Sequence, residues 1–312
     1  MVFSDFEEIG IIKYNFPLAP VTSMKTGGNA KYAFFPNSEE EIRSVILFLR
    51  KEGIKYCVIG FASNVLFRDE GYDGAVVFTS ELKTVSEEVD KLILEKLGIE
   101  TDERALFYAQ AGVSLTSFAF KTLKKGYAGL EFAYGIPASV GGAIFMNAGA
   151  YGGEISDCLL AVEFLDSNGE IEYLYNDKDK KLFSYRHSPF SDSPERTIIG
   201  GIFALPKASG DEYLNKALVN MHSRKTKQPL EYPSCGSAFK RPEGYYAGAL
   251  IEGAGLKGFS IGGACVSEKH AGFIVNKGGA TTNDVLALIK HVQDTVYEKD
   301  GVMLEPEIRI AD

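Results

Sequence analysis

The chain has 312 residues, of which 45% are hydrophobic and 24% charged, so it can bury a large core and divide into two or three domains. Its formal net charge of -9 leaves no excess of Lys and Arg to displace counterions from phosphate, which excludes nucleic acid as the expected partner. The N-terminal residues show no basic region followed by an apolar run, and no stretch elsewhere approaches a membrane span, so we expect a cytoplasmic protein.

Cysteine and histidine spacing gives no sign of a metal site. No CxxC motif occurs, and no histidine stands at metal-ligand or catalytic-triad spacing, so we expect reduced thiols, no disulfide framework and no metal. The residues concerned are Cys57, Cys158, Cys235, Cys265, His187, His222, His270 and His291.

The first predicted elements alternate between helix and strand. Residues 39–52 carry apolar positions at helical spacing, with Ser38 as N-cap and Gly53 as the C-terminal stop. Short buried-strand patterns follow at 56–59 and 65–67, separated by a glycine-containing loop.

The middle of the chain begins with a charged segment, residues 81–104, which we expect to be a partly helical, solvated insertion. Residues 114–125 predict a second helix. Residues 164–171 predict a β-hairpin with its turn at Asn168-Gly169.

The last third opens with a predicted helix over residues 211–223. A basic stretch bounded by proline, residues 224–229, is interpreted as a turn, and we place a domain boundary near it.

Three glycine-rich segments are candidates for binding phosphate, because residues without a Cβ can present consecutive backbone amides in a concave nest. None matches the dinucleotide fingerprint or the P-loop, and each alone is equally compatible with a tight turn. The third continues through Asn147, Ala148 and Gly149, in a run of small residues that allows backbone to lie close to a large ligand. The segments are Thr26-Gly27-Gly28, Gly60-Phe61-Ala62-Ser63-Asn64 and Gly135-Ile136-Pro137-Ala138-Ser139-Val140-Gly141-Gly142.

These segments resemble those of the UDP-N-acetylenolpyruvoylglucosamine reductases. The run 135–152 resembles that family's flavin-binding signature, 58–67 resembles its second phosphate-binding loop, and 26–30 matches as well. The chain departs from the pattern at Phe61, Ala62 and Ala138, where smaller residues are usual, and these departures put loop geometry and flavin affinity in question.

Three further segments, in the same order, resemble the family's catalytic segments. They are Tyr185-Arg186-His187-Ser188, Cys235-Gly236-Ser237-Ala238-Phe239-Lys240 and Leu304-Glu305-Pro306-Glu307-Ile308-Arg309, so the resemblance covers residues 22 to 310. It implies non-covalently bound FAD, NADPH as hydride donor, and UDP-N-acetylglucosamine enolpyruvate as the substrate, reduced to UDP-N-acetylmuramate for peptidoglycan.

The resemblance also implies an architecture. We expect an α+β protein with a two-subdomain FAD-binding module of the vanillyl-alcohol-oxidase type and a C-terminal α+β substrate-binding domain. The expected ranges are 1–80 and 81–223 for the FAD-binding subdomains, 224–300 for the substrate domain, and 301–312 for a strand that returns to the catalytic cleft.

Three residues receive catalytic roles from the resemblance, and the chemistry explains the residue types. Hydride addition to the enolpyruvyl group pushes negative charge toward its carboxylate, which the forked guanidinium of Arg186 suits. A protonated Glu307 can donate a further hydrogen bond, and Ser237 can deliver the proton to carbon. Strand alternation places Glu305 and Glu307 on one face, opposite Leu304, Ile308 and Ile310, so only the motif selects Glu307.

Other interpretations of these residues stay open. Taken singly, Arg186 suits a structural ion pair, Ser237 a turn on Gly236, and Glu307 a solvated strand. Cys235 is a nucleophile candidate, although no basic group can be assigned to activate it.

Substrate contacts are assigned by the same resemblance to Lys227, for the diphosphate, and to Lys257 and Asn276. Only 51 positions separate Arg186 from Ser237, which leaves no room for the tyrosine-bearing loop of some members and implies the shorter type. We expect a monomer. The alternatives are another flavoprotein, such as an alcohol or hydroxy-acid oxidase, and a nucleotide-binding regulator without turnover.

Overall fold

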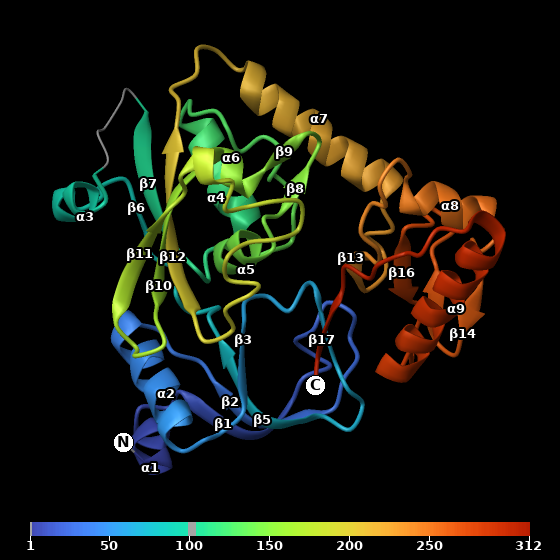
Figure 1. The fold of residues 1–312 in the computed structure, drawn as a ribbon, viewed down its shortest axis with the longest axis horizontal. Helices are drawn as coiled ribbons and strands as arrows, with labels where there is room; N and C mark the ends of the chain where they lie inside the picture. The colour runs from blue at the N-terminus through green and yellow to red at the C-terminus, as the bar shows by residue number, and fades with distance from the viewer. Residues whose placement is uncertain (1, 99–103) are drawn as a thin grey trace. The chain divides into compact units, whose positions relative to one another are not determined.

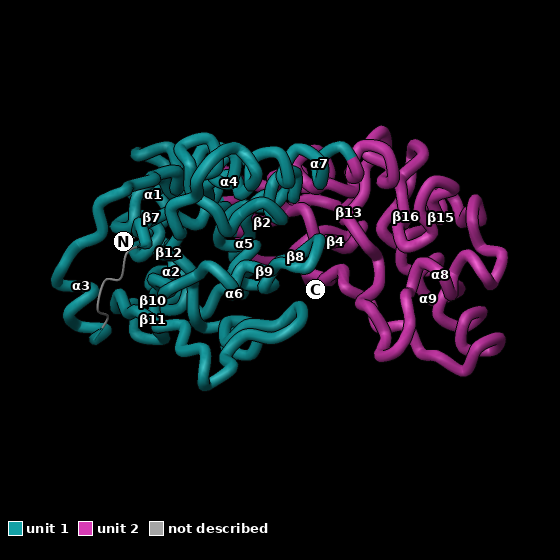
Figure 2. The backbone as a smooth tube through the Cα atoms, turned by 90° about the horizontal axis from the view of Figure 1, so that it is seen from above, with its two compact units in different colours: residues 1–12, 34–61, 77–222 teal, residues 13–33, 62–76, 223–312 magenta. Residues whose placement is uncertain are grey.

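The computed structural model of the chain describes residues 2–98 and 104–312, and these divide into two compact units (Figure 2). Unit 1 comprises residues 1–12, 34–61 and 77–222, and unit 2 comprises residues 13–33, 62–76 and 223–312. Each unit is therefore assembled from three separate stretches of the sequence.

The described residues form helices and five sheets (Figure 1). The helices are α1 (Phe3–Glu8), α2 (Glu39–Lys51), α3 (Lys91–Lys96), α4 (Leu115–Lys124), α5 (Val140–Phe145), α6 (Ile155–Cys158), the 3-10 helix η1 (Lys178–Lys180), α7 (Glu212–Lys227), α8 (Ala247–Gly253) and α9 (Thr282–Asp300).

Two sheets are built from the first two thirds of the chain. One has the order β1-β2-β5-β3, from strands β1 (Ile12–Pro17), β2 (Asn29–Phe34), β5 (Tyr72–Phe78) and β3 (Tyr56–Ile59). The other has the order β11-β10-β12-β7-β6, from strands β11 (Ile171–Tyr175), β10 (Leu159–Leu165), β12 (Thr197–Leu205), β7 (Ala105–Gln110) and β6 (Val85–Ser86).

The remaining sheets lie mostly late in the chain. The order β13-β16-β15-β14 joins β13 (Ser234–Ser237), β16 (Phe273–Asn276), β15 (Ala264–Val266) and β14 (Ser260–Ile261). Two-stranded sheets pair β17 (Arg309–Ala311) with β4 (Val65–Phe67) in parallel, and β8 (Gly149–Ala150) with β9 (Gly153–Glu154). Helices and mixed, mainly antiparallel sheets confirm the predicted α+β class.

The core of unit 1 surrounds strands β10 and β12, which lie side by side in antiparallel pairing (Figure 1). Every residue of both strands is buried, so both faces of this sheet are covered. Phe118 of α4, Ile144 of α5 and Ile155 of α6 pack on one face. The segment around α3 covers the other face, where Ile93 packs against a small apolar cluster.

The core of unit 2 is made by α8 and α9 on the sheet β13-β16-β15-β14. Helix α9 begins with a capping box in which Thr281 accepts a bond from Asp284, and it ends at Gly301 in the left-handed region (φ 68°). Its buried face, which includes Val285 and Val292, packs in one cluster with the sheet residue Ile274.

The predicted helices and strands of the first half are confirmed. Helix α2 begins after Ser38, whose Oγ accepts a hydrogen bond from Glu41 N at 3.2 Å, and Gly53 lies in the left-handed region (φ 64°) just beyond its end. Helix α4 and strands β3 and β4 occupy the expected residues.

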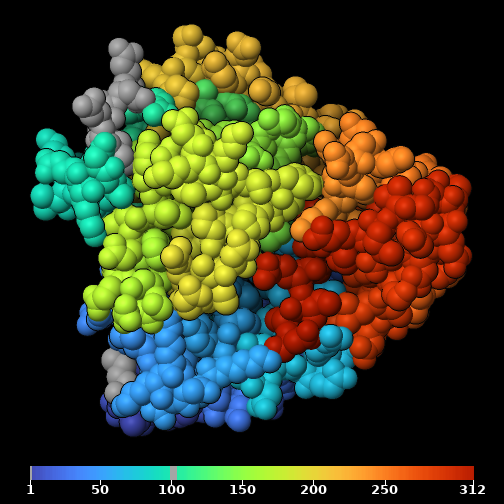
Figure 3. All heavy atoms as spheres, viewed as in Figure 1, coloured from blue at the N-terminus to red at the C-terminus, as the bar shows by residue number. Residues whose placement is uncertain are grey.

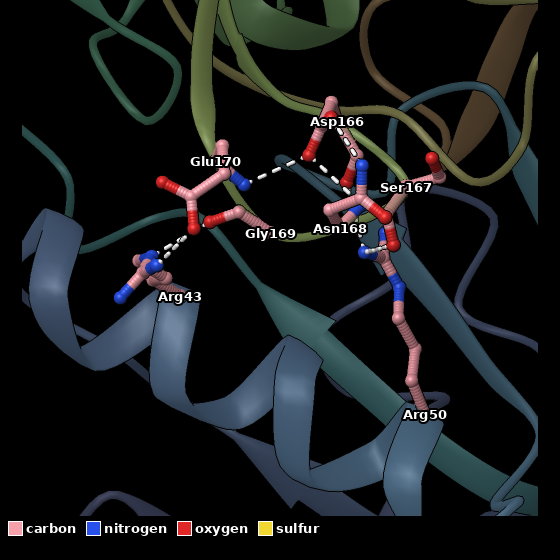
Figure 4. Close-up of polar contacts among 7 residues, drawn as sticks. All are labelled: Arg43, Arg50, Asp166, Ser167, Asn168, Gly169 and Glu170. Atoms are coloured by element: carbon pink, nitrogen blue, oxygen red, sulfur yellow. Dashed lines mark hydrogen bonds and ion pairs between the residues drawn. The ribbon is translucent and has the colours of Figure 1, made fainter.

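The predicted hairpin at 164–171 is also confirmed, with Leu165 opposite Ile171. Two arginines of α2 bind its tip (Figure 4). Arg50 Nη1 donates to the carbonyls of Asp166 and Ser167, both at 2.8 Å, and Arg43 Nε donates to Gly169 O at 2.6 Å. The tip of the hairpin is therefore held against α2.

One expectation needs correction. The predicted helix 211–223 continues as α7 to Lys227, so the expected basic turn is the last helical turn. Lys and Arg are good helix formers and suit a helix C-terminus, and the helix ends just before Pro229. The charged segment 81–104 contains α3, as expected of a partly helical segment, and Figure 3 shows α3, in teal, at the surface of unit 1. The segment also contains Val85–Ser86, which forms an edge strand paired with β7. Residues 99–103 of that segment lie outside the described residues.

Candidate active site

In unit 1, the loop 135–139 is fixed against the start of α4. Gly135 N donates to Thr116 Oγ1 at 3.1 Å, and the same hydroxyl donates to Ile136 O at 2.9 Å. The loop ends at Ser139, whose Oγ caps α5 by accepting from Gly142 N at 3.1 Å. The backbone of this predicted flavin segment is thus held in one conformation by neighbouring protein groups.

At two positions of the predicted cofactor segments, neighbouring atoms lie so close to the backbone that only glycine fits. A Cβ on Gly60 would overlap Ser139 Oγ and lie 2.9 Å from Ser139 Cβ, so Gly60 brings two candidate loops into contact within unit 1. A Cβ on Gly141 would lie 2.7 Å from Ala111 Cβ. Neither position has room for a side chain.

The three unusual residues of these loops differ in backbone geometry. Ala62 adopts a left-handed conformation (φ 49°), which costs a residue with a Cβ about 1 kcal/mol relative to glycine. Phe61 and Ala138 have no positive φ, and Ala138 N donates to Ile136 O at 2.9 Å. Of the three departures, Ala62 alone stands where the backbone itself favours glycine.

The segment Thr26-Gly27-Gly28, in unit 2, packs closely against the loop after β4. Thr26 is buried, and its hydroxyl accepts from Thr282 Oγ1 at 2.9 Å. Gly28 N donates to Arg68 O at 2.9 Å, and a Cβ on Gly28 would lie 2.6 Å from Gly71 N. The Thr26 side chain is therefore committed to protein packing.

Asn64, also in unit 2, carries a buried acceptor that no described group satisfies. Its Nδ2 donates to Glu307 O at 3.1 Å, but its Oδ1 is buried and has no hydrogen-bond partner among the described residues. A buried, unpaired amide oxygen is costly and rare in folded proteins. Its place in a predicted cofactor loop fits a ligand with N–H or O–H donors, and FAD carries both kinds.

Arg186 lies on a tight turn in unit 1. Ser184 and His187 exchange backbone hydrogen bonds, each 3.1 Å long, and Arg186 between them has a left-handed φ of 57°. Its Nη2 donates to Gly149 O at 3.1 Å, and its guanidinium stacks on the Tyr185 ring at 4.8 Å. Uncommon backbone geometry of this kind clusters at functional sites.

Ser237 lies at a β-bulge, where a simple turn was expected. Strand β13 pairs Ser234 with Val275 and Ser237 with Phe273, so β13 holds one extra residue, and Gly236 takes a left-handed φ of 76°. A bulge re-aims the side chain that follows it. Ser237 remains half-buried.

The segment 304–308 runs beside this bulge in unit 2. Glu307 N donates to Ala238 O at 2.9 Å, and Lys240 N donates to Glu305 O at 2.8 Å. Ser237, Glu307 and Asn64, although far apart in the sequence, are thereby brought together.

The expected strand alternation at the C-terminus is wrong in part. Pro306, which has no N–H, makes an isolated bridge with Phe239, and the regular strand β17 begins only at Arg309. Ile310, expected to share a face with buried Leu304, is 43% exposed. The two carboxylates also differ, since Glu305 is exposed and pairs with Lys240 Nζ at 2.5 Å, whereas Glu307 is half-buried.

The predicted substrate contacts occupy different environments. Lys227 is exposed at the end of α7, and Lys257 Nζ pairs with Glu252 at 2.9 Å. Asn276 is buried, and its amide donates to Met24 O at 3.0 Å and accepts from Gly278 N at 2.8 Å. The side chain of Asn276 therefore serves the packing of unit 2.

Cys235 does not have the environment of a nucleophile. Burial raises the pKa of its thiol to about 12, so the unreactive protonated form prevails at neutral pH.

All four cysteines are free thiols. Within residues 2–98 and 104–312, we find no group of three or more His, Cys, Asp or Glu that could hold a metal, and no helix long and apolar enough to cross a membrane.

Comparison with protein-family models finds two matches, which lie in different parts of the chain. Residues 228–311 match the family described as UDP-N-acetylenolpyruvoylglucosamine reductase, C-terminal domain, and residues 30–174 match an FAD binding domain.

Individual relatives cover nearly the whole chain. A UDP-N-acetylenolpyruvoylglucosamine reductase of Lactobacillus delbrueckii subsp. bulgaricus is 44% identical over 96% of this chain and 95% of its own length. One from Caldanaerobacter subterraneus subsp. tengcongensis is 45% identical over 96% and 94%. The crystal structure of the Thermus caldophilus reductase superposes with a TM-score of 0.76 at 31% identity, covering 96% of this chain and 98% of that one.

Proposed function

The chain belongs to the UDP-N-acetylenolpyruvoylglucosamine reductases, an assignment that makes it an FAD-dependent oxidoreductase, and we propose that it reduces UDP-N-acetylglucosamine enolpyruvate to UDP-N-acetylmuramate for peptidoglycan synthesis. When bound, FAD would supply two-electron redox chemistry: it would accept a hydride from NADPH and pass it from its N5 to the terminal enolpyruvyl carbon. Candidate residues for holding FAD are the glycine-rich loops and Asn64, and the lack of a partner for Asn64 Oδ1 among the described residues supports this assignment.

Arg186 binds the substrate carboxylate in this proposal. Its guanidinium is permanently charged and offers parallel N–H donors that match the two carboxylate oxygens. Negative charge grows on these oxygens as the hydride arrives, so the interaction is stronger in the transition state than in the ground state. The stacking of Arg186 on Tyr185 limits the orientations open to the guanidinium.

Ser237 donates the proton that completes the reaction. A serine hydroxyl is a weak acid, so its contribution depends on being held beside the carbon that carries the charge. The bulge at Gly236 fixes the backbone that aims this side chain. Glu307, whose main chain is bonded to Ala238, stabilises the same charge by donating a hydrogen bond from a protonated carboxyl.

The convergence of Asn64, Ser237 and Glu307 in unit 2 is the observation that carries the proposal. A cofactor loop, a candidate proton donor and a candidate charge-stabilising group meet there through the bonds from Asn64 Nδ2 to Glu307 O and from Glu307 N to Ala238 O.

Finer assignments follow from family membership alone. We propose substrate contacts by Lys227 and Lys257, FAD subdomains over 1–80 and 81–223, a substrate domain over 224–300, and a C-terminal strand over 301–312. Ser237 follows Arg186 by 51 positions, a spacing that supports the shorter type without the tyrosine loop. A monomer is proposed as the active form.

The test separates the two half-reactions. The purified protein should show the absorbance of bound flavin, and NADPH oxidation should depend on UDP-N-acetylglucosamine enolpyruvate. Ser237→Ala should keep flavin reduction by NADPH but lose flavin reoxidation by substrate, whereas Ser234→Ala, on the same strand, should keep both. A colourless protein that cannot be reconstituted with FAD would disprove the proposal, and unchanged turnover in Ser237→Ala would remove the proton-donor role.

A further inference from the structure

We propose that Asn147 is a positioning residue for Arg186: its side-chain amide holds the turn that carries the arginine. The inference rests on the proposed role of Arg186 in binding the substrate carboxylate. Sequence resemblance placed Asn147 with the cofactor-binding residues, but the contacts of its side chain point to a different task.

Asn147 is fully buried and has both ends of its amide engaged within unit 1. Its Nδ2 donates to Ser184 O at 3.0 Å, and its Oδ1 accepts from Ser156 N at 2.9 Å. The backbone of Asn147 is left-handed (φ 42°), a conformation that asparagine adopts more readily than most residues. The residue is therefore suited to this site both by its backbone and by its side chain.

The carbonyl that Asn147 binds is the one that closes the arginine turn. Ser184 O also accepts from His187 N at 3.1 Å, so one oxygen receives both the turn's own hydrogen bond and the asparagine bond. The left-handed conformation of Arg186 persists only if its surroundings hold it there. Asn147 supplies one such restraint at the first residue of the turn.

The segment after the turn is fixed to the same part of unit 1. Ser188 is fully buried, and its hydroxyl donates to Phe145 O at 2.7 Å, two residues before Asn147. Arg186 Nη2 in turn donates to Gly149 O, two residues after Asn147. The arginine turn is thus anchored at three points along 145–149, with Asn147 at the centre.

This arrangement predicts that losing the Asn147 donor moves Arg186 without removing it. A displacement of about 1 Å at a group that orients substrate can lower the rate roughly 100-fold. Flavin reduction by NADPH does not use the substrate carboxylate, so it should change less than 2-fold, that is, by about 0.4 kcal/mol or less.

The diagnostic variant is Asn147→Asp. Aspartate keeps the acceptor for Ser156 N and tolerates the left-handed backbone, but it cannot donate to Ser184 O when ionised. Asn176→Asp is the matched control, because Asn176 is also buried in unit 1 and donates to Ser156 O and Leu159 O, both at 2.9 Å, without touching the arginine turn.

The experiment measures both half-reactions in Asn147→Asp, Arg186→Ala, the double variant and the control. We expect Asn147→Asp to slow flavin reoxidation by substrate about 10- to 100-fold. In the Arg186→Ala background, the same substitution should slow reoxidation by less than a further 2-fold, because the effects of two residues that act through one group are not additive. Hydrogen exchange should show faster exchange at residues 184–188 in Asn147→Asp and not in Asn176→Asp. Asn147→Ala, which loses both bonds, should give the same pattern if the aspartate variant does not fold.

Different outcomes overturn different claims. If Arg186→Ala slows reoxidation but Asn147→Asp does not, or if the two effects multiply, the positioning role of Asn147 is wrong. If Asn176→Asp slows reoxidation as much as Asn147→Asp does, the slowing comes from general destabilisation, and the positioning role of Asn147 is likewise wrong. If Arg186→Ala itself reoxidises at the wild-type rate, the proposed role of Arg186 fails instead.

Discussion

Gly60→Ala tests whether the contact between Gly60 and Ser139, two candidate cofactor residues of unit 1, governs flavin affinity. The added Cβ would overlap Ser139 Oγ and lie 2.9 Å from Ser139 Cβ, whereas ordinary contact begins at 3.4 Å. The backbones at Gly60 and Ser139 must therefore move apart by at least 0.5 Å, the difference between 3.4 and 2.9 Å. Ser139 cannot yield easily, because it is buried and caps α5.

The expected loss of FAD affinity in Gly60→Ala can be estimated from the free-energy cost of overpacking. Inserting one carbon into a close-packed site costs about 1 to 3 kcal/mol. If the loops relieve the overlap by separating and must close again on FAD, affinity falls roughly 5- to 150-fold. We expect the variant to purify partly colourless and to bind added FAD more weakly in a titration that follows flavin fluorescence.

A control and a rescue make the test specific. In Gly253→Ala, the new Cβ would lie 3.6 Å from Lys299 Nζ, in ordinary contact, so FAD affinity should not change. Ser139→Ala removes the oxygen that the new methyl overlaps, and the double variant Gly60→Ala/Ser139→Ala should bind FAD better than the two single effects combined would give. Wild-type affinity and thermal stability in Gly60→Ala would refute the reasoning.

Three further predictions concern unit 1 stability and the thiol of Cys235. Arg50→Lys should lower the free energy of unfolding by about 1 to 2 kcal/mol in urea titrations, because the single nitrogen of lysine cannot replace three nitrogens that donate to Tyr56, to the hairpin tip and to Glu195 O; no change would mean that these contacts are not stabilising. Cys235→Ala should keep turnover, and Cys235 should resist a thiol reagent at pH 8 in the native state, since burial raises its pKa to about 12; fast labelling would contradict this. Burial and the neighbouring Glu163 carboxylate raise the pKa of Tyr108, so the folded state binds more protons above pH ~10 and stability should fall as pH rises past that value. Tyr108→Phe should weaken this alkaline decline in urea midpoints measured from pH 8 to 11, and an identical decline would show that Tyr108 is not its cause.

Local elements were predictable because their signals lie within a few residues. Helix α2 follows from its apolar spacing, the Ser38 cap and the Gly53 stop, and the hairpin at 164–171 from its Asn-Gly turn. The extent of α7 was not predictable, because the basic residues at its end favour helix and turn alike in the absence of tertiary contacts.

The sequence by itself determined the family, the α+β class and the candidate catalytic residues, since these are recorded in short motifs and their order. Only the tertiary structure decided what each side chain touches. The bulge that aims Ser237 depends on pairing with a strand almost forty residues later, and the bond from Asn64 to Glu307 O spans 243 residues. For Asn147 and Asn276, the sequence motifs predicted ligand contacts, whereas the structure shows that each buried side-chain amide donates to a protein carbonyl. A motif does not reveal such partners.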